Sequence, residues 1–166
     1  ELRRFNWRVS YSNINASFED NFNALSPNHN FADDEGEIQV RSGDQIPGIP
    51  EHQFKFLGNY ELSNDLFLGF DITRNSKQFL RGDESNQLDQ IDEYTVANLR
   101  LRYEINEDLR IFATVQNLFN QEFETFGLLG EEPNELEVPI IENLETPIFL
   151  GAAAPRAGYI GLSYSF

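Results

Sequence analysis

The chain has 166 residues, no cysteine and a formal net charge of −16, from 12 basic and 28 acidic side chains. The negative charge argues against nucleic acid or anionic lipid as a partner, because proteins bind both through clusters of Lys and Arg. The lack of cysteine excludes disulfides, thiolate metal sites and cysteine nucleophiles. No stretch approaches the roughly 18 consecutive apolar residues of a membrane helix, but the strands of a membrane barrel need only about 9 to 11 residues each.

Six segments alternate apolar and polar residues, which is the period-2 pattern of a strand with one apolar face. In chain order they are residues 5–18, 52–62, 66–74, 94–105, 109–119 and 156–166. No segment with helical periodicity competes, so the sequence predicts an all-β, antiparallel meander with one polar face. In the first segment the apolar parity shifts after Tyr11 and resumes at Ile14, which predicts a β-bulge near Asn13.

The connections alternate in length. Residues 63–65 and 106–108 form tight turns, whereas 19–51, 81–93 and 120–155 are long and rich in Asp, Glu, Asn, Gly and Pro. The three long segments hold eight, five and eight of the 28 acidic residues. Outer-membrane barrels have short periplasmic turns and longer extracellular loops. The pattern therefore predicts a transmembrane β-barrel segment with an acidic outer rim.

The last segment ends in IGLSYSF, in which apolar residues occupy every second position. We expect these residues to face lipid and Ser163 and Ser165 to face the lumen. The alternation up to a terminal Phe also resembles the final strand through which bacterial outer-membrane proteins engage their assembly machinery. The residues of this predicted assembly signal are Ile160, Leu162, Tyr164 and Phe166.

Six strands are too few to close a barrel. A barrel with a filled interior takes about eight strands. An open sheet would leave two bare edges in hydrocarbon, where unsatisfied backbone groups are costly. We therefore expect residues 1–166 to be the C-terminal portion of a larger barrel domain.

The stretch VQNLFNQEFETFG, residues 115–127, resembles the N-L-F-[ND]-x-x-[YF]-x-x-x-G run of TonB-dependent outer-membrane receptors, with Phe123 in place of the more usual Tyr. APRAGYIGLSYSF, from Ala154, is similar to the closing pattern of that family. The segments SPNHN, GDQIPGIPEH and FLRGDESNQ resemble its loops. The resemblance implies a barrel of about 22 strands with a plugged lumen, of which this chain supplies roughly the last six.

The resemblance also implies a function and its partners. Such receptors lie in the outer membrane of Gram-negative bacteria and import a scarce nutrient such as a ferric siderophore, haem or cobalamin, with an iron chelate as the first expectation. The TonB complex is expected to act through an N-terminal plug region, which has no counterpart in these residues. Other expected partners are the assembly machinery, the lipid bilayer and lipopolysaccharide.

Six residues of the predicted outer loops are candidates for contact with an extracellular small-molecule substrate. They are His29, Phe31, Phe79, Arg81, Phe123 and Phe126. For the aromatic residues the alternative is packing within the loops. For His29, as for His52, it is an ordinary surface residue, because neither has a second His or Cys at ligand spacing. We expect no metal site and no cofactor.

Three further patterns leave alternatives open. Charged residues on the polar parity, namely Lys55, Asp71, Arg100, Arg102, Glu104 and Arg110, either contact a plug by charge-assisted hydrogen bonds or line a solvated wall. Arg81-Gly82-Asp83 matches an adhesion tripeptide, although a Gly-Asp turn explains it fully. The acidic loops either attract divalent cations or cationic chelates, or form a solvated face suited to salt or to cation-bridged lipopolysaccharide.

Two other classes of protein compete with the receptor. One is a passive or structural outer-membrane protein, porin or adhesin-like, built from several chains. The other is a soluble acidic β-barrel, which would leave apolar stripes exposed on successive strands. No nucleophile elbow, HExxH motif, phosphate-binding glycine loop or EF-hand spacing occurs, so we expect no enzyme.

Overall fold

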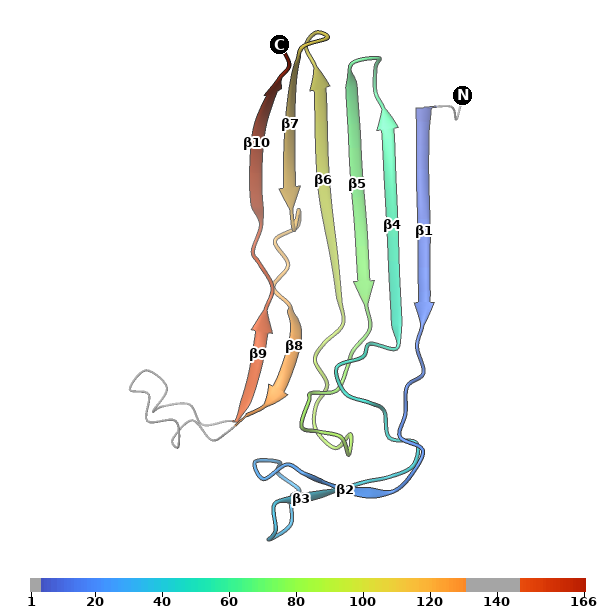
Figure 1. The fold of residues 1–166 in the computed structure, drawn as a ribbon, viewed down its shortest axis with the longest axis vertical. Helices are drawn as coiled ribbons and strands as arrows, with labels where there is room; N and C mark the ends of the chain where they lie inside the picture. Colours follow the sequence, from blue (N-terminus) through green and yellow to red (C-terminus); the bar gives the residue numbers. More distant parts are fainter. Residues whose placement is uncertain (1–3, 131–146) are drawn as a thin grey trace, which may run out of the picture.

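The computed structural model describes residues 4–130 and 147–166 (Figure 1). All ten regular elements in these residues are β-strands, arranged in one six-stranded sheet and two two-stranded sheets. No helix among them is long and apolar enough to cross a bilayer. Residues 131–146, in the third predicted loop, lie outside the described part of the chain.

The large sheet is antiparallel throughout, in the order β1-β4-β5-β6-β7-β10. Its strands are β1 (Phe5–Asn13), β4 (His52–Glu61), β5 (Leu66–Asn75), β6 (Tyr94–Glu104), β7 (Leu109–Gln116) and β10 (Ala157–Tyr164). Each corresponds to one of the six predicted segments. The all-β, antiparallel prediction is confirmed.

The register sorts the two parities onto two faces of the sheet. Across the strands, Phe5 lies opposite Tyr60, followed by Leu68, Leu101, Ala113 and Ile160. Many large apolar side chains on this face are exposed, with Ile160 at 84%, whereas those of β5 in the middle of the sheet are half-buried. In the described residues the buried apolar side chains are Ile38, Val40, Leu80 and Ile91, none of which belongs to the large sheet. The sheet is therefore a wall with an outward apolar face rather than one half of a soluble core.

A glycine makes room for an aromatic cluster on the apolar face. The ring centroid of Phe70 lies 5.6 Å from that of Phe56 and 6.3 Å from that of Phe5. A Cβ added at Gly58 would lie 2.5 Å from the Phe70 ring. Gly58 therefore interrupts the apolar parity of β4 so that the Phe70 ring can lie across it.

The long connections gather at one end of the sheet and the short turns at the other (Figure 1). Two hairpins that sequence reasoning did not predict lie at the long-loop end. They are β2 (Phe22–Leu25) with β3 (Glu37–Val40), and β8 (Glu124–Leu129) with β9 (Ile148–Ala152). The β2–β3 hairpin lies across the end of the large sheet (Figure 1).

The predicted bulge near Asn13 is wrong. β1 pairs with β4 in unbroken register from Phe5–Tyr60 to Asn13–His52. Beyond it, the Ile14 amide donates to the Glu51 carbonyl at 2.9 Å, and Ser17 forms an isolated bridge with Gln45. Between Ile14 and Ala16 the partner segment runs from Glu51 to Ile46 and is therefore longer than the stretch of chain it faces. Two prolines in this segment interrupt the ladder of backbone hydrogen bonds. The parity shift in the sequence marks the end of β1.

Candidate functional site

The three long connections form one unit at the outer end, here called the loop assembly: the described residues of 14–51, 76–93 and 117–156. The Ser26 hydroxyl donates to the Gly82 carbonyl at 2.7 Å, and the Asn28 amide donates to the Gly130 carbonyl at 2.7 Å. The Leu129 amide donates to the Arg81 carbonyl at 2.8 Å. Within residues 4–130 and 147–166, the buried apolar side chains lie inside this unit. Contacts among these buried apolar side chains explain how loops rich in polar residues hold a defined shape.

A buried histidine–carboxylate pair joins the first two loops. His29 Nε2 lies 2.9 Å from Asp83 Oδ1, and both side chains are fully excluded from solvent. The Phe31 amide donates to His29 Nδ1 at 3.1 Å, which assigns the proton to Nε2 and makes His29 the donor to Asp83. The expectation that His29 is a surface residue is therefore wrong. His52 is a surface residue, with its side chain 52% exposed.

Asp83 is also the hydrogen-bond centre of its own loop. Its carboxylate accepts from the Gln87 amide at 2.9 Å, the Leu88 amide at 3.0 Å and the Ser85 hydroxyl at 3.3 Å. Gly82 has a φ of +95° and its carbonyl accepts from Ser26. The Asp of the Arg81-Gly82-Asp83 tripeptide is thus unavailable to a partner, which excludes the adhesion reading in this conformation.

The structure brings four of the six candidate residues together in two pairs. The ring centroids of His29 and Phe31 lie 5.8 Å apart. The Arg81 guanidinium lies over the Phe126 ring, 5.5 Å from its centroid, and both side chains are exposed. Phe31 is 62% exposed. Phe123 stacks on Tyr94 with ring centroids 4.2 Å apart, and Phe79 is half-buried. Substrate contact by these residues stays a prediction. His29 could take part only if the loop assembly opened.

Acidic residues of the loop assembly pair with the few nearby bases. Lys77 Nζ lies 2.7 Å from Asp92 Oδ1, and Arg74 makes two 2.8 Å hydrogen bonds to Glu93. The hydrogen bond and charge of Asp92 raise the pKa of Lys77. The described residues hold no group of three or more metal-ligating side chains.

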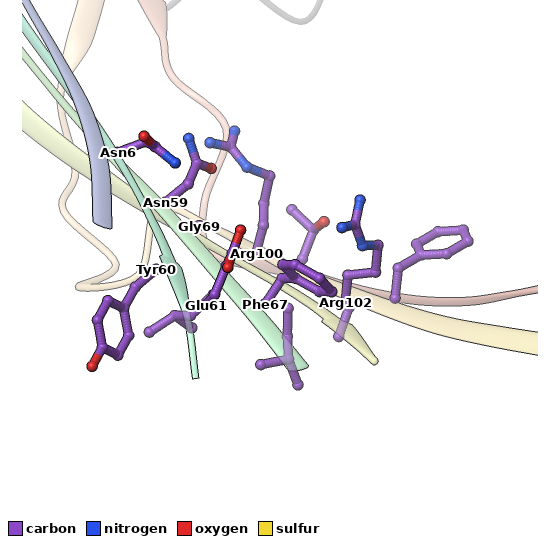
Figure 2. Close-up of a pocket in the computed structure, with 13 residues that line it drawn as sticks. Asn6, Asn59, Tyr60, Glu61, Phe67, Gly69, Arg100 and Arg102 are labelled. Atoms are coloured by element: carbon purple, nitrogen blue, oxygen red, sulfur yellow. The ribbon is translucent and has the colours of Figure 1, made fainter. Parts of the chain in front are cut away.

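The polar face of the sheet has a pocket of about 460 Å³ near the short turns (Figure 2). Its polar and aromatic lining includes Asn6, Asn59, Glu61, Phe67, Arg100, Arg102 and Phe112. Arg100 Nη1 lies 2.9 Å from Asp71 Oδ1, and the Arg102 guanidinium lies 4.1 Å from the Phe67 ring centroid. Both arginine side chains are about half exposed, at 45% and 48%. The alternation of the sequence placed both arginines on this face, but it gave no sign of the pocket or of the stacking on Phe67.

The N-L-F-N motif links the wall to the loops through two asparagines with positive φ, Asn117 at +48° and Asn120 at +52°. Asn117 Oδ1 accepts from the Gln121 amide at 2.9 Å, and Asn117 Nδ2 donates to the Gln121 and Ala154 carbonyls. Asn120 Oδ1 accepts from the Arg156 amide at 3.0 Å. Asn tolerates the left-handed region and bonds the backbone locally, so the motif ends β7 and ties it to the segment before β10.

Several solved structures have a similar fold. The siderophore receptor PiuA from Acinetobacter baumannii is similar over 98% of this chain and 20% of its own, with a TM-score of 0.73 and 13% identity. The ferric yersiniabactin uptake receptor FyuA from Yersinia pestis is similar over 99% of this chain and 21% of its own, with a TM-score of 0.62 and 14% identity. At these identities the likeness concerns the fold.

Comparison of sequences gives the family. The chain is 34% identical over 80 residues to the ferric-pyoverdine 358 receptor of Pseudomonas putida, which covers 46% of this chain and 10% of that protein. The aligned part thus spans about a tenth of the curated relative. Residues 1–118 match the family model described as TonB dependent receptor-like, beta-barrel. The chain belongs to the TonB-dependent receptors, the β-barrel proteins of the Gram-negative outer membrane.

Proposed function

We propose that this chain forms the C-terminal portion of the barrel of a TonB-dependent receptor that imports a ferric siderophore or another iron chelate. The observation that carries the proposal is the six-stranded sheet, whose apolar face is exposed while the buried apolar residues of the described chain lie in the loop assembly. The substrate class is supported by the names of the similar proteins, which include receptors for ferric pyoverdine and ferric yersiniabactin.

The two edges of the large sheet support a barrel that continues beyond these strands. Within the described residues, β1 pairs only with β4 and β10 pairs only with β7. Unpaired backbone groups in hydrocarbon are costly, so each edge needs a further strand. In the proposed receptor, β10 pairs with the first strand of the barrel, and Ile160, Leu162, Tyr164 and Phe166 form the assembly signal.

The remaining proposed partners follow from the same function. The substrate would bind at the loop assembly, with Arg81, Phe126 and Phe31 as the exposed candidates. The plug and the contact with TonB would belong to a region outside these residues. Lipid would contact the apolar face, and lipopolysaccharide would contact its outer border. The family consists of receptors rather than enzymes, and we propose no catalytic role.

Uptake by the full-length receptor tests the proposal. The protein would be expressed in a Gram-negative strain that lacks its own siderophore receptors, with and without a functional TonB. We expect accumulation of radiolabelled iron from at least one of a panel of ferric siderophores, only when TonB is functional. Uptake without TonB, together with swelling of protein-containing liposomes in small sugars, would instead favour a passive porin.

A further inference from the structure

The start of the third outer loop, the described residues of 117–156, is held by a side chain of the neighbouring strand. The paired register of β6 and β7 runs as far as Leu99 and Val115. Just beyond it, the Asn117 amide donates to Asn98 Oδ1 at 2.9 Å. A side-chain oxygen of β6 thus accepts the hydrogen bond of a backbone amide that would otherwise lack an acceptor at the end of the ladder.

A charge-assisted pair holds Asn98 in turn. Asn98 Nδ2 donates to Asp71 Oδ2 at 2.7 Å, and Asp71 Oδ1 lies 2.9 Å from Nη1 of Arg100. One end of the Asn98 amide faces a backbone N–H and the other faces a carboxylate, so only one orientation of this amide satisfies both partners. The Asp71 side chain is only 16% exposed, and a hydrogen bond to a carboxylate shielded from water is stronger than one between neutral groups. Asp71 therefore fixes the orientation of Asn98.

Asn117 connects these hydrogen bonds to both ends of the loop. The residue is buried, with a φ of +48°. Its Oδ1 accepts from the Gln121 amide at 2.9 Å, and its Nδ2 donates to the Ala154 carbonyl at 3.2 Å. Gln121 lies where the loop begins and Ala154 where it ends, so one buried side chain ties the two together. The backbone amide of that residue is itself held by Asn98.

The same residues line a pocket of about 260 Å³ where the polar face of the sheet meets the third outer loop. Asp71, Asn98 and Arg100 belong to its sheet side, and Phe123 and residues 153–155 belong to its loop side. A shift of the loop relative to the sheet would therefore change the shape of this pocket. It would also move Phe123, which is one of the candidates for substrate contact.

We infer that Asn98 is a positioning residue for substrate binding, and that the hydrogen-bonded series Arg100–Asp71–Asn98, here called the wall relay, holds the third outer loop in its binding position. This inference rests on the proposed receptor function. Arg100 and Asp71 orient the Asn98 amide, Asn98 holds the Asn117 amide, and Asn117 holds the loop. A substrate that arrives from outside then meets Phe123 in a position set by wall residues that the substrate need not contact.

An exchange of two side chains tests the wall relay in the full-length receptor. Asn98→Asp keeps an acceptor for the Asn117 amide but places a second carboxylate against Asp71. The double variant Asp71→Asn/Asn98→Asp restores an amide–carboxylate pair in the reverse order and has the net charge of the wild type. We expect hydrogen exchange at the Asn117 and Gln121 amides to become roughly ten-fold faster in the single variant, because a shielded polar group loses its partner. Exchange should return toward the wild-type rate in the double variant.

The exchange experiment has a matched control and a check on folding. Asn6→Asp makes the same chemical change on the same face of the sheet, outside the wall relay, and should leave both amides protected. The backbone amides of β4 should keep their protection in all variants, which distinguishes local release of the loop from global unfolding. Equal exchange rates in Asn98→Asp and Asn6→Asp would overturn the inference. A double variant that exchanges as fast as Asn98→Asp would also overturn it.

Uptake measurements connect the wall relay to the substrate. The probe is the radiolabelled ferric siderophore that the wild-type receptor imports from the panel described above. We expect Asn98→Asp to raise the siderophore concentration for half-maximal uptake several-fold with little change in the maximal rate, and the double variant to reverse this effect. An unchanged half-maximal concentration in Asn98→Asp would overturn the inference. Absence of uptake by the wild-type receptor would instead contradict the proposed function, so the two failures are distinguishable.

Discussion

His29 and Asp83 lie 54 residues apart in the sequence and meet inside the loop assembly, with His29 Nε2 2.9 Å from Asp83 Oδ1. Neither side chain is exposed to solvent. Because Asp83 also accepts two amide hydrogen bonds from its own loop, the pair fixes that loop and links it to the β2–β3 hairpin. The outer loops are therefore expected to move as one body.

Replacement of Asp83 by Ala should release the loop assembly. Removing the Asp83 carboxylate leaves the His29 Nε2–H and two loop amides without their acceptor, and each buried group left unpaired costs about 1–3 kcal/mol. We expect faster hydrogen exchange at Gln87 and Leu88 and faster proteolysis of both loops. Asp89→Asn, at an exposed position in the same loop, is the control. Equal protection of both variants would show that Asp83 is not the centre of the assembly.

Replacement of Gly161 by Ala should destabilise the contact between β7 and β10. The added Cβ would lie 2.2 Å from the Phe112 ring, whereas a Cβ at Gly158 on the same strand meets nothing within 4 Å. Overpacking of a close-packed core costs about 1–3 kcal/mol, and because the Phe112 ring is 46% exposed we expect a cost near the lower end of that range. Urea unfolding in detergent should detect the difference between Gly161→Ala and the matched control Gly158→Ala. Rescue by Phe112→Leu would confirm the cause, and equal stability of the two Ala variants would refute it.

Replacement of Asn117 by Ala should impair the pairing of β7 with β10, because Asn117 ties the end of β7 to the segment before β10. The variant loses the side-chain bonds to Gln121 and Ala154 and keeps a positive φ that Ala disfavours. We expect a loss of about 1–3 kcal/mol, because buried polar groups lose their partners. The fraction of heat-modifiable protein in the outer membrane measures the effect. Gln116→Ala, exposed and one residue earlier, should leave that fraction unchanged.

Arg81 and Phe126 should act together if they contact the substrate. Arg81→Ala and Phe126→Ala are each expected to weaken binding of the ferric chelate, by about 0.5–2 kcal/mol for a cation–π pair that is desolvated on binding. A double-mutant cycle on dissociation constants should show coupling between the two positions. Thr125→Ala, at an exposed neighbouring position, is the control. Unchanged affinity in both single variants would remove the pair from the site.

The ion pair of Lys77 with Asp92 should persist throughout the neutral pH range. Asp92 raises the pKa of Lys77 above its ordinary value of 10.5. A raised lysine pKa stabilises the folded state below the ordinary value, and this contribution disappears as the pH rises through the raised value. NMR titration of the Lys77 side chain, assigned with Lys77→Arg, should detect a lower pKa in Asp92→Asn. An unchanged titration curve would mean that the pair is absent in solution.

Local patterns in the sequence determined the strands of the wall. The pleat of a single strand places alternate residues on opposite faces, so the alternation from Leu66 to Ile72 is enough to assign each residue to a face. The turn residues between strands indicate which connections are short. The N-L-F-N motif pointed to the family, although the positive φ of Asn117 and Asn120 emerged only from the structure.

The tertiary structure alone decided how the loops are built. Asp83 reads as part of a solvated turn, yet contact with His29 buries it completely. The β2–β3 and β8–β9 hairpins lack the continuous alternation from which a strand could be predicted. The irregular pairing of residues 46–51 depends on a partner segment that is distant in the sequence. A strand can be predicted from the alternation of apolar and polar residues within its own sequence. A buried hydrogen bond between two loops requires both partners, and the sequence near either one does not identify the other.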